Sequence, residues 1–168
     1  MLLKLVPVIA TLLLCACVLS SKTPKFAAAD GAAAIAANTE FDAYTKDGNG
    51  WRKEDESFSF KRDGKAYLMS DGKNIASVSF IQLTPEWFAA QYRENDEPFF
   101  YGLVRTTGGG LDITPLPCDK LKAFAAGTKD LAFSGDDCSI DAVADPKAFF
   151  TTLIDKIPGP EMKLVPRP

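Results

Sequence analysis

The 168-residue chain contains no histidine. This absence excludes Ser-His-Asp and Cys-His nucleophile systems, and it removes the ligand that most zinc sites use. The sequence also has no GxSxG nucleophile elbow. It therefore predicts a non-enzymatic protein with no catalytic residues, no metal site and no cofactor. The alternative that survives is a hydrolase built on carboxylates alone, for which Asp136-Asp137 is the candidate acid pair.

The chain also lacks a cluster of charge of one sign. It has 19 basic and 22 acidic residues, and the charged block at 52–56 mixes both signs. Such mixing is typical of a solvated surface. Because nucleic-acid binding requires a basic patch, we expect no nucleic-acid partner.

No apolar run is long enough to span a membrane as a helix. The longest early run, Leu5 to Leu14, has about ten residues, whereas a spanning helix needs about 20. Lys4 precedes this run and supplies a short basic region. The two features together predict a secretory signal peptide.

The residues directly after the apolar run are Leu14-Cys15-Ala16-Cys17. This motif resembles the lipobox of bacterial lipoproteins, although Cys15 departs from the usual choice at its position. The resemblance implies cleavage before Cys17, diacylation of Cys17 and acylation of the new amino terminus. It also implies the periplasmic face of the outer membrane, because Val18 stands where an Asp tends to retain lipoproteins in the inner membrane. The alternative is an ordinary signal peptide cleaved near Ser20.

Cysteine is scarce in the rest of the chain. With Cys15 in the signal peptide and Cys17 carrying lipid, only Cys118 and Cys138 remain. Exported proteins meet an oxidising compartment, so we expect these two to form a disulfide. The closed loop of about 20 residues corresponds to roughly 3 kcal/mol of stabilisation. A redox or metal pair is the alternative, but the CxxC spacing is missing.

Composition divides the chain into four parts: a signal peptide over 1–16, a lipidated Ala-rich tether over 17–40, one compact domain over 41–157 and a Pro-rich tail over 158–168. The tether has no apolar face, and Gly31 interrupts its alanines, so it is expected to be a flexible spacer. Proline keeps the tail extended and outside the domain.

Turn and alternation signals predict strands within 41–157. Asp-Gly pairs, which suit tight hairpin turns, occur at 47–48, 63–64 and 71–72. Apolar and polar residues alternate at 57–60 and 76–80. Two apolar runs flank the glycines at 108–110 and predict a central hairpin over 99–116. The pattern indicates an antiparallel β-meander sheet of about five to seven strands.

Residues 84–94 fit two interpretations. Thr84 and Pro85 resemble the start of a helix. Phe88, Ala90 and Tyr92 alternate with polar or small residues, as in a strand. We favour a strand over 87–93 and keep the helix as the alternative.

The period becomes helical after Cys118. A short helix is expected near 119–126, and a C-terminal helix near 146–157 starts with Asp145 as N-cap and proline at the first position. An apolar stripe along the second helix predicts that it packs on the sheet. The expected fold class is therefore α+β.

The expected role is a membrane-tethered periplasmic binding or interaction module, held by the N-terminal lipid and working with an envelope protein partner. Trp51 and Trp87 are the candidate binding surface, because exposed tryptophans contact sugars and proteins. The alternatives are a periplasmic protein inhibitor and the carboxylate hydrolase.

Overall fold

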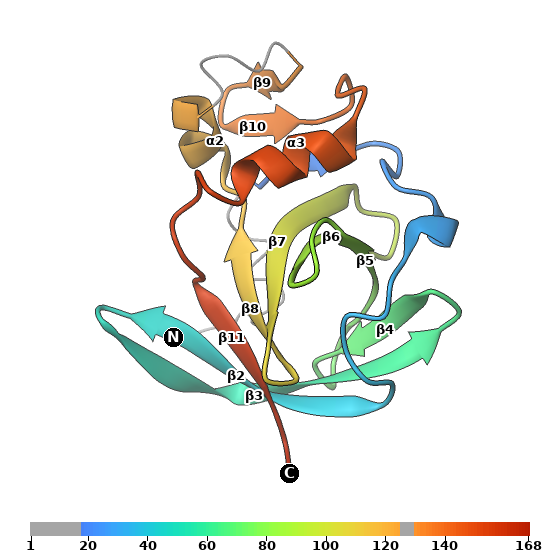
Figure 1. The fold of residues 1–168 in the computed structure, drawn as a ribbon, viewed down its shortest axis with the longest axis vertical. Coiled ribbons are helices and arrows are strands. Elements are labelled where there is room, and N and C mark those ends of the chain that lie inside the picture. Colours follow the sequence, from blue (N-terminus) through green and yellow to red (C-terminus); the bar gives the residue numbers. More distant parts are fainter. Residues whose placement is uncertain (1–17, 125–129) are drawn as a thin grey trace, which may run out of the picture.

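The computed structural model describes residues 18–124 and 130–168, and its main feature is a closed β-barrel. Eight antiparallel strands form the ring in the order β6-β5-β4-β3-β2-β11-β8-β7, and pairing of β6 with β7 closes it (Figure 1). The ring strands are β2 (Thr39–Asp47), β3 (Gly50–Asp63), β4 (Ala66–Ser70), β5 (Ile75–Gln82), β6 (Trp87–Glu94), β7 (Phe99–Thr107), β8 (Gly110–Pro115) and β11 (Met162–Pro166).

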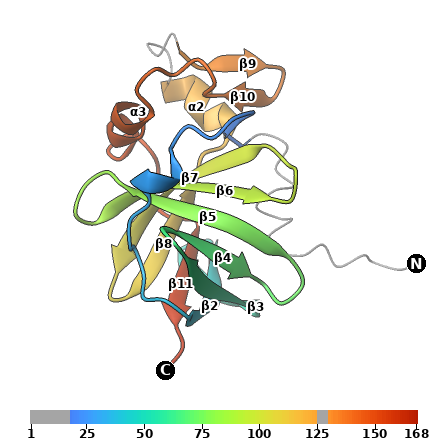
Figure 2. The same cartoon turned by 90° about the vertical axis from the view of Figure 1, so that its right-hand side faces the viewer.

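A second layer lies against the outside of the barrel. Its strands continue the sheet from β7 in the order β1, β10, β9. We call α2, β9, β10 and α3 the cap, which sits above β7 in both views (Figures 1 and 2). The elements outside the ring are β1 (Ser20–Ser21), a short 3-10 helix η1 (Ala28–Asp30), α2 (Cys118–Phe124), β9 (Ala132–Ser134), β10 (Asp137–Ser139) and α3 (Pro146–Leu153).

The predicted α+β fold with an open meander sheet of five to seven strands is wrong. The structure is mostly β, and its sheet closes into an eight-stranded barrel with three further strands. Closure depends on β11, which pairs antiparallel with both β2 and β8. The sequence predicts an extended tail over 158–168, because Pro158-Gly159-Pro160 stops a helix and Pro166 and Pro168 favour an extended chain. Pro166, however, lies past Leu164, the last residue of β11 that pairs with β8, so it is at an edge on that side and its missing N–H is tolerated.

Several local elements match their sequence signals. The three Asp-Gly pairs lie at the β2–β3, β3–β4 and β4–β5 turns, and their glycines have positive φ of 59°, 60° and 85°. Residues 87–94 form a strand rather than a helix. Both expected helices are present, but α3 ends at Leu153 instead of 157. The Asp145 carboxylate accepts a hydrogen bond from the Ala148 N–H at 2.9 Å, as an N-cap does.

Two apolar cores explain why the middle parts of β6 and β7 and the end of β5 are buried on both faces. Phe80, Phe88 and Val104 point into the barrel, while Ile81 and Ala89 point outward to the cap. The inner core is rich in aromatic rings. Its aromatic residues that are at most 2% exposed are Phe41, Phe58, Phe60, Tyr67 and Phe80. The outer core joins the cap to the barrel through Phe150, which is fully buried.

The disulfide between Cys118 and Cys138 is present, as predicted. The two Cα atoms are 5.6 Å apart, and both residues are buried in the outer core. The bond joins the first residue of α2 to the middle of β10. It therefore holds the cap together rather than closing the barrel.

The expectation of a flexible spacer over residues 18–40 is not met. Leu19, Phe26 and Ile35 are at most 7% exposed, and they fill gaps in the two cores. Three apolar side chains in a segment dominated by alanine give no periodic signal, so their burial could not be seen in the pattern. Leu19 and Phe26 join the outer core beside the cap, whereas Ile35 enters the inner core.

Gly31→Ala tests whether this segment is packed. Gly31 bridges to Ile81, and a Cβ at residue 31 would overlap the backbone carbonyl of Lys65. We expect a loss of about 1–3 kcal/mol in the free energy of unfolding, as for overpacked sites. Chemical denaturation measures the loss.

Gly159→Ala is the matched control, because a Cβ at residue 159 meets no atom within 4 Å. A flexible spacer would make Gly31→Ala neutral or slightly stabilising, since alanine reduces the entropy of the unfolded chain. Equal stabilities for the two variants would thus contradict the packed arrangement.

Candidate functional site

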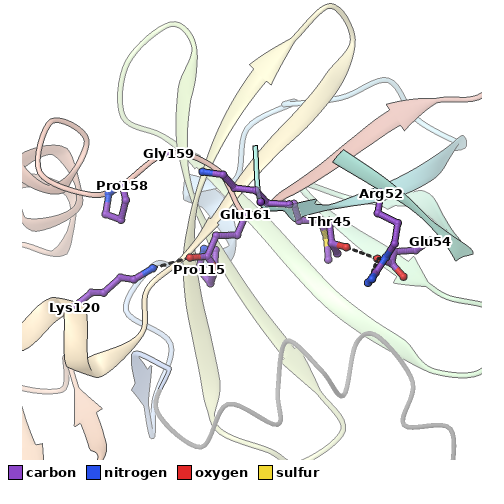
Figure 3. Close-up of a pocket in the computed structure, with 11 residues that line it drawn as sticks. Thr45, Arg52, Glu54, Pro115, Lys120, Pro158, Gly159 and Glu161 are labelled. Atoms are coloured by element: carbon purple, nitrogen blue, oxygen red, sulfur yellow. Dashed lines mark hydrogen bonds and ion pairs between the residues drawn. The ribbon is translucent and has the colours of Figure 1, made fainter. Parts of the chain in front are cut away.

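One end of the barrel opens into a cavity of about 730 Å³, which we call the mouth. At this end β2 turns into β3, β8 ends at Pro115 and β11 begins at Met162. Figure 3 shows side chains from these elements and from α2 around the opening. The lining residues are Thr45, Lys46, Gly48, Arg52, Glu54, Pro115, Lys120, Pro158, Gly159, Glu161 and Met162.

Each of the two carboxylates in the mouth is paired with a cation. Arg52 donates to Glu54 at 3.1 Å, and Lys120 donates to Glu161 at 2.6 Å (Figure 3). The Thr45 hydroxyl also donates to Glu54. This hydrogen bond, assisted by Arg52, lowers the pKa of Glu54, and the bond to Glu54 raises the pKa of Arg52. Both groups therefore stay charged at neutral pH.

Lys46 is the third cation of the mouth. It is exposed, and within the described residues its ammonium lies within 4.0 Å of no carboxylate. The lining side chains carry three positive and two negative charges, and the Asp47 carboxylate, 3.9 Å from Arg52 Nη1, supplies a third negative charge. The charges at the opening therefore balance, and Lys46 is the cation that can contact an anionic group of a ligand.

A smaller apolar cavity of about 80 Å³ lies inside the barrel behind the mouth. Pro115 lines both spaces, and Val18 closes part of the inner wall. The inner cavity is well below the roughly 300–1,000 Å³ of typical ligand pockets. It has room for a short apolar group, while the mouth has room for the polar remainder. Burial raises the pKa of Tyr92, which lines the inner cavity, so its phenol is neutral.

Trp51 and Trp87 lie at opposite ends of the barrel. Trp51 pairs with Lys46 beside the β2–β3 turn, and Trp87 pairs with Arg105 near the β7–β8 turn. Each indole is contacted by its own cation: Lys163 Nζ lies 4.3 Å from the Trp51 ring centroid, and Arg105 Cζ lies 5.9 Å from that of Trp87. Neither tryptophan lines the mouth or the inner cavity.

The other candidate residues do not join the mouth. Cys118 and Cys138 are buried in the cap as the disulfide. Asp136 and Asp137 are exposed where β9 turns into β10. Cys17 lies outside the described residues.

Sequence reasoning missed the mouth. Arg52 and Glu54 belong to the block that we assigned to solvated surface, and their neighbours Lys120 and Glu161 lie more than sixty residues away. No short motif joins these four residues. The nearest available signal was in residues 41–45. Phe41, Ala43 and Thr45 share one face of a strand there, and the last of the three is polar.

Within residues 18–124 and 130–168, no helix is both long and apolar enough to cross a membrane. The same residues contain no group of three or more side chains placed to hold a metal ion. No protein-family model matches this chain, and no curated protein or solved structure is significantly similar to it.

Proposed function

We propose that the protein is a lipoprotein of the bacterial cell envelope whose barrel is a non-enzymatic module that binds a small anionic ligand at its mouth. Its mature chain begins at Cys17, which carries the lipid, and the domain faces the periplasm at the outer membrane. The lipobox-like residues 14–17 support the anchor and the location. Stable anchoring generally takes two acyl chains, which a diacylated cysteine supplies.

The observation that carries the binding role is the mouth itself. Ligand sites favour the mouths of β-barrels, and they combine apolar walls with a few polar groups that orient the ligand. Here the apolar inner cavity lies behind the charged lining of the mouth. Lys46 is the lining cation that can contact a ligand. The carboxylates Glu54 and Glu161 already have partners, so they shape the rim.

The state of Glu54 favours binding over carboxylate catalysis. A carboxylate hydrolase needs one carboxyl group that stays protonated near neutral pH, which requires a raised pKa. The pKa of Glu54 is shifted in the opposite direction by Thr45 and Arg52. Glu161 is held by the Lys120 ammonium at 2.6 Å.

The binding role is tested on the lipoprotein purified from envelopes, by native mass spectrometry of the small molecules that it retains. Lys46→Gln is expected to lower occupancy by an anionic ligand about tenfold or more, because hydrogen bonds to charged groups are worth about 1.5–3 kcal/mol. Thermal stability should stay unchanged, since Lys46 is exposed.

Lys61→Gln is the matched control. Lys61 is also exposed, also lacks an ion pair within the described residues, and lies near the far end of β3. Equal occupancy in both variants, or no retained anion in the wild type, would refute binding at the mouth. The mass of the N-terminal peptide tests the anchor separately, with Cys17→Ser as the unlipidated control.

A protein inhibitor is the second candidate, and the β2–β3 hairpin is the feature that favours it. Beyond the hydrogen bond from the Lys46 N–H to the Glu161 carbonyl at 2.9 Å, the hairpin strands pair with each other and project from the barrel (Figure 1). A photo-crosslinker at Asn49, in the exposed turn, tests this role in cells. Crosslinking to an envelope hydrolase, together with loss of that enzyme's activity, would favour inhibition over ligand binding.

A further inference from the structure

We propose that the mouth faces the bilayer in which the protein is anchored, and that its ligand is an anionic lipid of that bilayer. This inference rests on the proposed function, namely the lipid on Cys17 and ligand binding at the mouth. It adds the orientation of the barrel and the source of the ligand.

The first step is that the described chain packs on the barrel from its first residue, Val18. Leu19 is fully buried; its N–H donates to the Leu116 carbonyl at 3.0 Å, and its carbonyl accepts from the Tyr101 N–H at 3.1 Å. Val18 forms a bridge with Pro117. Consecutive Cα atoms are about 3.8 Å apart, so Cys17 can lie no farther than that from Val18. A lipid on Cys17 thus holds the barrel directly at the membrane surface.

The second step is that the attachment point lies at the mouth end. Val18 lines the inner cavity together with Pro115 and Ile113. Pro115 also lines the mouth, and Ile113 pairs with Met162 at the start of β11. The lipid is therefore attached beside the opening, and the far end of the barrel, where Trp87 lies, is held away from the bilayer.

The third step concerns which membrane molecule fits. The inner cavity of about 80 Å³ cannot hold a whole acyl chain, but it can take a few apolar atoms. The mouth suits a phosphate-bearing head group, because the Lys46 ammonium has no carboxylate within 4.0 Å among the described residues. A lipid that stays in the bilayer can present its head group to an opening that faces it, with no need to leave the membrane.

The two tryptophans provide the test of orientation. Full-length lipoprotein is reconstituted into phosphatidylcholine vesicles with brominated acyl chains, which quench nearby indoles. Two single-tryptophan variants are compared: Trp87→Phe, which keeps Trp51 at the mouth end, and Trp51→Phe, which keeps Trp87 at the other end. We expect a clearly larger loss of fluorescence for the variant that retains Trp51. Equal quenching, or stronger quenching of Trp87, would overturn the inference.

The ligand is tested in vesicles of phosphatidylcholine with added phosphatidylglycerol. Native mass spectrometry after gentle release should find phosphatidylglycerol on the wild type and on Lys61→Gln, and about tenfold less on Lys46→Gln. Retention of phosphatidylcholine alone, or displacement of the lipid by soluble glycerol phosphate, would contradict a bilayer ligand.

The failures can be told apart. A mature N-terminal peptide without lipid, measured before reconstitution, refutes the anchor of the proposed function. A lipidated protein whose Trp51 is not preferentially quenched refutes only the orientation. A lipidated protein that retains a water-soluble anion keeps the binding role and refutes the lipid ligand.

Discussion

Deletion of Glu161–Pro168 is expected to abolish cooperative folding of the whole barrel. The deletion removes β11, whose Met162 and Leu164 are at most 4% exposed in the inner core. Full burial of two such side chains is worth about 3–6 kcal/mol in all. The deletion also leaves β2 and β8 with unpaired edges. Total stabilities are typically about 5–15 kcal/mol, so we expect loss of the thermal transition in circular dichroism.

Deletion of Pro168 alone is the control, because this residue is exposed and follows the strand. It should leave the transition within about 0.5 kcal/mol of wild type. A tail outside the domain, as expected from sequence, would make both deletions harmless. A folded, cooperative protein after removal of Glu161–Pro168 would therefore show that the barrel does not need β11.

Gln91→Ala is expected to lower the free energy of unfolding by about 3 kcal/mol and to release the N-terminal segment from the barrel. The Gln91 side-chain oxygen accepts the N–H groups of Lys25 and Phe26 at 2.9 and 3.1 Å, and its amide donates to the Phe26 carbonyl at 3.2 Å. The Tyr101 hydroxyl donates to the same oxygen and is bonded in turn to Ser21. Each buried polar group left without a partner costs about 1–3 kcal/mol.

Hydrogen exchange provides the measurement for Gln91→Ala. Amide protection should fall at residues 19–26 while the barrel strands keep theirs. Gln82→Ala is the matched control, since Gln82 is an exposed glutamine on β5. Unchanged protection at 19–26 in Gln91→Ala would show that the buried apolar side chains hold the segment without this network.

The turns and most strands could be predicted from sequence because their signals are local. An Asp-Gly pair meets the need for positive φ at a tight turn wherever it occurs, and Gly48, Gly64 and Gly72 all adopt it. The alternation in β5 reports the burial of one face without reference to any other strand. The N-cap at Asp145 is a local signal too, because its carboxylate accepts the N–H of Ala148, three residues later.

The cysteine pairing was also predictable, for a different reason. Once Cys15 and Cys17 are assigned to the export signal, only Cys118 and Cys138 remain in the chain. Composition and compartment then predict the bond without any knowledge of the fold. Its place in the cap, away from the mouth, required the structure.

Barrel closure, the packed N-terminal segment and the mouth depended on tertiary structure. Met162–Pro166 carries too few residues to show a strand pattern, and its partners Phe41–Thr45 lie more than a hundred residues earlier. Leu19 and Phe26 are isolated apolar residues whose burial depends on Tyr101 and the cap. Sequence alone determined the disulfide and the local turns, because each depends on neighbouring residues or on composition. The fold decided where Val18 and Lys46 lie relative to the mouth, because only long-range strand pairing brings those residues together.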